Sequence, residues 1–150
     1  MKINLLYDSD KILSGHTNVD SFAINDKNKV CCDLEQLYFC SRGEATEILV
    51  DNVLSYYSAK QVKQMLAHYI SLLAYGGSLS VTDVNAYEVS RRFMLNKINS
   101  DEFNKLLFGE KYSRKSLLNI TDVSNLMTSM GLKIKFKKIN DTEFTVVGVR

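Results

Sequence analysis

Several residue types and patterns are scarce in this chain of 150 residues. It contains no proline, a lack for which we find no physical reason, and only three cysteines, the adjacent Cys31 and Cys32 and the separate Cys40. These cysteines exclude the disulfide framework that holds many small secreted domains together, and they form no C-x-x-C pair. The only histidines are His16 and His68, and no spacing of histidines, cysteines and acids suggests a metal site.

Long apolar runs and a strong net charge are also missing. No stretch approaches the roughly 18–20 apolar residues that span a bilayer. At the N-terminus, Lys2 precedes a short apolar stretch and then acids, a pattern unlike a signal peptide. We therefore expect a cytoplasmic protein with no membrane contact. The net charge of +2 gives no general attraction to nucleic acid, and the length fits a single domain over residues 1–150.

The apolar pattern predicts a chain in which strands and helices alternate. Strands are expected at residues 2–6, 17–20, 29–34, 46–51, 78–82, 133–138 and 143–149, of which the last two form a hairpin. Helices are expected at residues 58–74, 85–97, 100–108 and 121–130, with a polar loop at 109–118, N-caps at Ser58, Ser100 and Thr121, and Gly76-Gly77 ending the first helix. Apolar side chains at helical spacing give the first helix a side that we expect to face the sheet; they include Val62, Leu66, Tyr69 and Leu73.

Four lysines gather in the first strand of the expected C-terminal hairpin, at positions 133, 135, 137 and 138. A basic cluster of this kind could contact nucleic acid. Its nearly alternating spacing is more typical of the solvent face of an edge strand, where lysine discourages pairing with another sheet. We favour the second interpretation and expect no nucleic-acid partner.

The turn after the first strand lacks glycine. In open α/β sheets that bind nucleotide-like cofactors, this turn is glycine-rich because backbone amides must approach the ligand closely, and an acid after the next strand accepts the ribose hydroxyls. Here Asp20 and Asp33 supply acids at the ends of the second and third expected strands, but Leu6, Tyr7 and Asp8 occupy the turn.

The connections between the first three expected strands are short and polar. Parallel strands usually need a crossover of a dozen or more residues that includes a helix. We therefore expect covering helices to be missing on this half of the sheet. The uncovered face would either expose Val19 and one side of the neighbouring strands or present a half-polar surface with Lys2, Asn4 and Cys31. Such a face favours a protein partner or self-association; the alternative is a polar face that water tolerates.

The order of these elements resembles class I S-adenosylmethionine-dependent methyltransferases, and in particular the short bacterial and phage predicted methyltransferases. Asn4-Leu5 matches the family's Leu-Asn-Leu-Gly-Cys-Gly opening, and Gly15 with Asn18-Val19-Asp20 matches its Gly-Tyr-x-Asn-Val-Asp stretch. Further matches are Asp33-Leu34 to its Asp-Leu pair, residues 47–54 to its fourth strand and the next helix, Gly76-Gly77 to its Pro-Gly-Gly turn, and residues 117–131 to its last helix. The resemblance implies an α/β, Rossmann-like open sheet, mostly parallel, with a C-terminal antiparallel β-hairpin.

The resemblance also implies S-adenosylmethionine as cofactor and a set of cofactor-binding positions, which are Leu6, Asp8, Asp20, Asp33, Leu34 and Asn52. Asp20 and Asp33 would contact the ribose and the adenine edge; the alternative is that each only caps a turn after its strand. Asn52 would face a substrate pocket, although a plain turn residue is the commoner role at such a position. No metal is implied, and no catalytic residue can be assigned.

Two departures bear on function. The family's turn glycines fall on Leu6 and Asp8, where a Leu Cβ disfavours positive φ and the Asp8 carboxylate would lie near the cofactor's own carboxylate. We expect Tyr7 to fill the space of the methionine moiety. Ser55-Tyr56 also replaces the family's Glu-His. The sequence thus predicts a methyltransferase-like protein that has lost efficient cofactor binding and acts as an interaction or assembly subunit; the alternative is an active methyltransferase on an unknown substrate.

Overall fold

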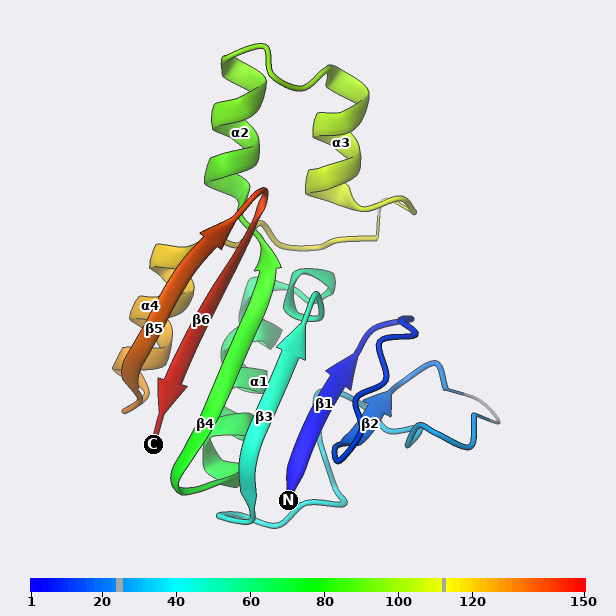
Figure 1. The fold of residues 1–150 in the computed structure, drawn as a ribbon, viewed down its shortest axis with the longest axis vertical. Helices are drawn as coiled ribbons and strands as arrows, with labels where there is room; N and C mark the ends of the chain where they lie inside the picture. Colours follow the sequence, from blue (N-terminus) through cyan, green and yellow to red (C-terminus); the bar gives the residue numbers. More distant parts are fainter. Residues whose placement is uncertain (24–25, 112) are drawn as a thin grey trace.

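A computed structural model describes residues 1–23, 26–111 and 113–150 as a six-stranded sheet with the strand order β2-β1-β3-β4-β6-β5 (Figure 1). The strands are β1 (Lys2–Leu6), β2 (Thr17–Asp20), β3 (Ala45–Asp51), β4 (Leu73–Val84), β5 (Lys133–Asn140) and β6 (Glu143–Val149). The first four strands pair in parallel, and β4-β6 and β6-β5 pair antiparallel. This confirms the expected Rossmann-like sheet with its C-terminal hairpin.

Among the described residues, four helices lie close to the residue ranges that the sequence predicted. They are α1 (Ala59–Leu72), α2 (Ala86–Met94), α3 (Ser100–Phe108) and α4 (Ile120–Ser129), with a short 3₁₀ turn, η1 (Leu54–Tyr56). Ser58 caps α1 through a reciprocal pair of hydrogen bonds with Gln61, as the sequence predicted. The N-caps of α3 and α4 were predicted one and two residues too late. Asn99 and Asn119 perform that role, because their side-chain oxygens accept the first free backbone N–H groups of each helix. None of the described helices is both long and apolar enough to cross a membrane.

Gly76 and Gly77 do not end α1, contrary to the prediction. The helix stops at Leu72, and Leu73 is already extended as the first residue of β4. The two glycines lie within β4, where the backbone at Gly77 passes close to other backbone atoms. A Cβ on Gly77 would lie 2.9 Å from the carbonyl oxygens of both Ala45 and Ala74, and Gly76 has a φ of +76°. The pairing of β3 with β4 shifts register at this point.

The predicted third strand at residues 29–34 is also wrong. Only Val30 pairs with β2, as an isolated bridge to Val19. Beyond Val30 the backbone turns, because the Asp33 carboxylate accepts the N–H of Glu35 at 2.9 Å. The hydroxyl of Tyr69 on α1 donates to the carbonyl of Leu34 at 2.6 Å, and this bond ties the segment to α1.

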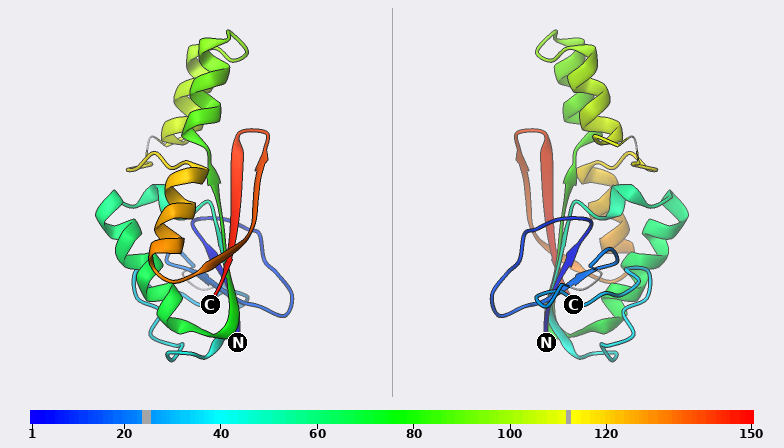
Figure 2. Two further views of the ribbon diagram at one scale, coloured as in Figure 1. Left: turned by 90° about the vertical axis from the view of Figure 1, so that its left-hand side faces the viewer. Right: turned by 90° about the vertical axis from the view of Figure 1, so that its right-hand side faces the viewer.

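The two faces of the sheet differ in their cover. Helices α1 and α4 lie on one face, whereas α2 and α3 project beyond the carboxyl ends of the strands (Figures 1 and 2). The core lies under α1 and α4 and includes Ile3, Leu5, Val19, Ile48, Val50, Leu66, Tyr69, Leu79, Val81, Met127, Phe144 and Val146. Figure 2 shows no helix on the opposite face among the residues that the structure describes. We call this opposite face, over β3, β4, β6 and β5, the open face.

The absence of covering helices does not leave β1 and β2 exposed in the way that the sequence suggested. Ile3, Leu5 and Val19 are completely buried, because they point toward the helix-covered core. Asn4, expected on an uncovered surface, is also buried; its side-chain amide donates to Asn18 Oδ1 at 2.8 Å and to the carbonyl of Lys11 at 3.0 Å. The segment after β1 therefore covers this end of the sheet without a helix.

The four lysines of β5 are exposed on an edge strand. They do not share one face, however. A register shift between Ile134 and Phe136 places Lys133 and Lys138 beside open-face residues of β6 and Lys137 beside the core residue Val146.

Candidate functional site

The carboxyl ends of the parallel strands β1, β2, β3 and β4 meet at one edge of the sheet, where ligands bind in folds of this architecture. Four aromatic rings gather there. The Tyr7 ring, directly after β1, stacks on Tyr56 of η1 with ring centroids 4.0 Å apart and an angle of 4° between planes. Phe22 and Tyr57 meet Tyr7 edge-on at 5.0 Å and 6.2 Å. Each such pair contributes about 0.5–1.5 kcal/mol beyond its buried area.

Two of these tyrosines, Tyr57 and Tyr7, are neutral near pH 7. Burial, with the nearby Asp33 second, raises the pKa of Tyr57 to about 12. Burial also raises the pKa of Tyr7, helped by Tyr56 and Asp8. Tyr7 and Tyr57 therefore contribute apolar rings with neutral hydroxyl groups at physiological pH.

The two positions of the missing glycines behave differently. Leu6 is an ordinary buried residue of β1, so its side chain lies within the sheet rather than in the turn. The positive φ falls on Asp8, at +47°, a conformation that aspartate tolerates better than most residues. The Asp8 carboxylate lies 3.3 Å from the ammonium group of Lys111, and its backbone N–H donates to Asp20 Oδ1 at 3.4 Å.

Asp20 is a buried residue at the end of β2, and its carboxylate contacts neighbouring groups of the same chain. Oδ1 accepts the N–H of Phe22 at 3.0 Å, and Oδ2 lies 3.6 Å from the ammonium group of Lys29. Burial alone would lower the pKa of Lys29, but the carboxylates of Asp20, Asp10 and Asp26, each 3.6 Å away, raise it above its usual value. Asp20 thus belongs to a compact charge cluster in which the Lys29 ammonium group lies among three carboxylates.

The other predicted cofactor-binding positions have structural roles in turns or in the core. Asp33 caps the turn after Val30 and is exposed, and Leu34 is buried in the core. Asn52 adopts a φ of +54°, and its amide donates to Glu143 Oε1 at 2.9 Å and to Asp51 Oδ1 at 3.0 Å. Of the predicted set, Leu6 pairs with Asp20 across β1 and β2, and Asp8 donates its backbone N–H to the Asp20 carboxylate.

An ion pair that the sequence did not single out closes the same edge. Asp83, completely buried near the end of β4, accepts from Arg114 Nη1 at 2.9 Å and from the Ser55 N–H at 3.1 Å. Arg114 also donates to the Ser55 hydroxyl at 2.8 Å, and its guanidinium lies 5.2 Å from the centre of the Tyr56 ring. Burial raises the pKa of Asp83 above its usual value, although Arg114 and the Ser55 hydrogen bonds oppose the shift. Arg114 thereby holds the loop after α3 against the aromatic cluster.

This arrangement leaves little room for a nucleotide-like cofactor. The cavity beside Tyr7 measures about 240 Å³ and is lined by Tyr7, Asp8, Tyr56, Glu110, Lys111 and Ser113, whereas small-molecule sites usually measure about 300–1,000 Å³. The Asp8 and Asp20 carboxylates already have cationic and N–H partners. As arranged, the side chains at this edge do not fit S-adenosylmethionine.

Comparisons with known proteins bear on the fold. No protein-family model and no curated protein matches the sequence. Solved structures do match. An S-adenosylmethionine-dependent methyltransferase from Mesorhizobium loti superposes with a TM-score of 0.66 at 11% identity, over 90% of this chain and 80% of that one. The 1,6-didemethyltoxoflavin-N1-methyltransferase of Burkholderia thailandensis, solved with S-adenosylhomocysteine, gives 0.63 at 10% identity, over 99% and 71%.

The chain is short beside some of these structures. It spans 35% of an O-methyltransferase family protein from Burkholderia thailandensis, which matches 81% of this chain at 15% identity with a TM-score of 0.60. Likeness at such low identity establishes the fold and not the activity. The fold of this chain is that of the class I S-adenosylmethionine-dependent methyltransferases.

Proposed function

We propose that this chain is a methyltransferase-like scaffold that does not bind S-adenosylmethionine efficiently and that serves as an interaction subunit. The observation that carries the first half is the stack of Tyr7 on Tyr56 at the carboxyl edge of the sheet. A cofactor that entered here would have to displace Tyr7 and separate Asp8 from Lys111. Since small ligands must also offset their own loss of freedom, these costs reduce affinity directly.

One observation favours the alternative, an active methyltransferase. Asp8 keeps the left-handed backbone conformation that a glycine would adopt in the turn, so the path of the chain is compatible with the family's loop. Methyl transfer also requires little of the protein beyond placing the two reactants in line. An active enzyme would then need Tyr7 to rotate away on binding.

Calorimetry separates these two functions. We expect no measurable heat from S-adenosylmethionine or S-adenosylhomocysteine with the unchanged chain, and a gain of binding when Tyr7→Ala is combined with Asp8→Gly. Tyr75→Ala is the matched control, because this tyrosine is 98% exposed outside the cluster. Micromolar binding by the unchanged chain would refute the proposal.

The second half of the proposal rests on the open face, whose side chains form three rows across four strands. One row joins Glu47, Ser78, Val149 and Lys133; the next joins Leu49, Ser80, Val147 and Phe136; the third joins Asp51, Thr82, Thr145 and Lys138. The outer rows each begin with an acid on β3 and end with a lysine on β5. The middle row is mostly apolar, and Phe136 is 49% exposed.

This pattern is complementary to itself. If a second copy faces the first across a two-fold axis parallel to the strands, β3 of each copy lies opposite β5 of the other. The same row then meets itself, so Glu47 faces Lys133, Asp51 faces Lys138, and Leu49 faces Phe136. Both acids already contact cations of their own chain, yet their side chains stay 30% and 28% exposed and can accept another. We therefore propose a second copy of this chain as the partner, in a symmetric dimer.

Sedimentation velocity over a range of concentrations tests the dimer. Lys133→Glu with Lys138→Glu should abolish concentration-dependent association, and adding Glu47→Lys and Asp51→Lys should restore it. Lys137→Glu makes one charge reversal of the same kind on the same strand but beside the core side of β6, so it should leave association unchanged, whereas Lys133→Glu or Lys138→Glu alone should weaken it. A chain that stays monomeric at every concentration would refute self-association without affecting the cofactor result.

A further inference from the structure

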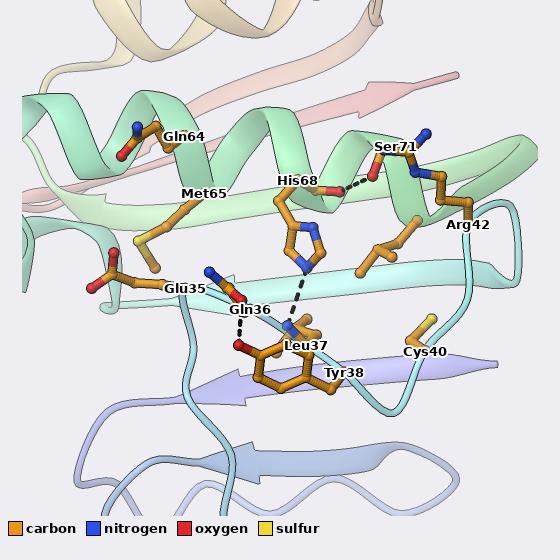
Figure 3. A pocket seen from close by; sticks show the side chains of 11 residues that line it. Glu35, Gln36, Leu37, Tyr38, Cys40, Arg42, Gln64, Met65, His68 and Ser71 are labelled. Carbon is orange, nitrogen blue, oxygen red and sulfur yellow. Dashed lines mark hydrogen bonds between the residues drawn. The ribbon is translucent and has the colours of Figure 1, made fainter.

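A second cavity lies away from the carboxyl edge, between α1 and the connection from Glu35 to Arg42 (Figure 3). It measures about 590 Å³, within the usual range for small-molecule sites. It lies over core side chains that are almost fully buried, namely Leu37, Cys40, Met65 and Leu72. Polar side chains complete the lining; they include Gln36, Gln64 and Ser71.

His68 presents a defined hydrogen-bond donor to this cavity. The backbone N–H of Leu37 donates to His68 Nε2 at 3.1 Å, and because a backbone amide can only donate, Nε2 must be unprotonated. Burial, with Arg42 second, lowers the pKa of His68, which keeps the ring neutral at pH 7. In the neutral ring Nδ1 then carries the proton. Figure 3 shows this nitrogen on the side of Ser71 and Arg42.

The two ends of the cavity differ in charge. Arg42 stands at one end, and no carboxylate lies within ion-pair distance of it in the described ranges 1–23, 26–111 and 113–150. Glu35 stands at the other end, where its carboxylate accepts from the Gln61 amide at 2.9 Å. A ligand with one anionic group would therefore be oriented, with that group toward Arg42 and His68 and away from Glu35.

We propose that this cavity, which we call the α1 cleft, binds a small molecule that carries one carboxylate or phosphate group. The anion would accept from the Arg42 guanidinium and from His68 Nδ1. Hydrogen bonds in which at least one partner is ionised, as the anion is here, are about twice as strong as bonds between neutral groups. The site is separate from the carboxyl edge, so it does not depend on whether the cofactor binds there.

Two-dimensional ¹H–¹⁵N NMR titration of the full chain tests the α1 cleft, with benzoate and phenyl phosphate as anionic probes and benzyl alcohol as the neutral probe. Saturable shifts are expected at the amides of Leu37 and of residues 68–72 with at least one anion, and roughly tenfold weaker binding of benzyl alcohol. Comparison of the two anions identifies which group the cleft prefers.

Two charge-matched variants sharpen the test. Arg42→Gln should weaken anion binding roughly tenfold and leave benzyl alcohol unchanged. Lys63→Gln removes the same charge from the exposed side of α1, outside the cleft lining, and should have no effect. Because both side chains are exposed, neither change should unfold the chain, and thermal melting checks this. Absence of saturable shifts with both anions, or equal effects of the two variants, would overturn the proposal.

Discussion

The buried pair of Asp83 and Arg114 offers a sharp test of how the carboxyl edge is held together. Replacing Arg114 by Met keeps most of the side-chain volume but leaves the Asp83 carboxylate in the interior without its cation. Removing one partner of a buried pair usually costs about 3–5 kcal/mol of unfolding free energy. We expect the lower part of that range, because Asp83 keeps hydrogen bonds from the N–H groups of Ser55 and Val84 at 3.1 and 2.8 Å.

The loss should depend on pH in a definite direction. The folded pKa of Asp83 is raised, so the folded state holds this proton at pH values where the unfolded chain has released it. Stability therefore declines as pH rises from the unfolded pKa through the folded one. Without Arg114, which lowers the pKa of Asp83, the folded value rises further. The penalty of Arg114→Met should thus grow as pH rises through the folded pKa of Asp83, and shrink as pH falls toward the unfolded pKa, where Asp83 takes up a proton in both states.

Urea unfolding of the variant and the unchanged chain at several pH values measures this effect. Asp83→Asn combined with Arg114→Met should recover part of the loss, because no charge then remains buried. Arg91→Met is the control: Arg91 pairs with Glu88 on the surface of α2 with its side chain 59% exposed, and such pairs contribute about 0–1 kcal/mol. A penalty for Arg114→Met that is below about 1 kcal/mol, or that is the same at every pH, would refute the assigned role.

Two further substitutions test the fold by chemical denaturation. Leu66→Ala, at a completely buried position of α1, should cost about 2–5 kcal/mol, whereas Lys63→Ala on the exposed side should stay within about 0.5 kcal/mol; equal small losses would show that the face of α1 is misassigned. Gly77→Ala should cost about 1–3 kcal/mol, because its Cβ would lie 2.9 Å from two backbone oxygens; a neutral effect would mean that β4 does not approach Ala45 as described.

The sequence predicted those parts of the fold that depend on local pattern. Strand β3 follows from a continuous apolar run, and the start of α1 follows from Ser58, whose capping partner Gln61 is three residues away. The third strand failed because its fate depends on a tertiary contact, the bond from the Tyr69 hydroxyl to the Leu34 carbonyl across 35 residues. Gly76-Gly77 were misread because glycine commonly ends helices, while here it permits a close approach to β3.

In the candidate site, too, the local features could be predicted from the sequence and the tertiary contacts could not. The missing turn glycines directed attention to Tyr7, but nothing local indicated that Tyr56 would stack on it from 49 residues away or that Phe22 would close its edge. Asp83 and Arg114 are 31 residues apart, and the polar loop that holds Arg114 has no periodicity that could pair it with a strand. Charge pairs of this kind emerge only from the tertiary structure.

The central claim, that Tyr7 and its partners fill the cofactor position, is tested most directly by residue-resolved NMR with S-adenosylhomocysteine. The unchanged chain at about 1 mM ligand should show no saturable shifts at the amides of Tyr7, Asp8 and Asp20, since a dissociation constant above that value corresponds to less than about 4 kcal/mol of binding. The variant that combines Tyr7→Ala with Asp8→Gly should show shifts at Asp20 and its neighbours. Saturable shifts around Asp8 and Asp20 in the unchanged chain, with micromolar affinity, would contradict the account.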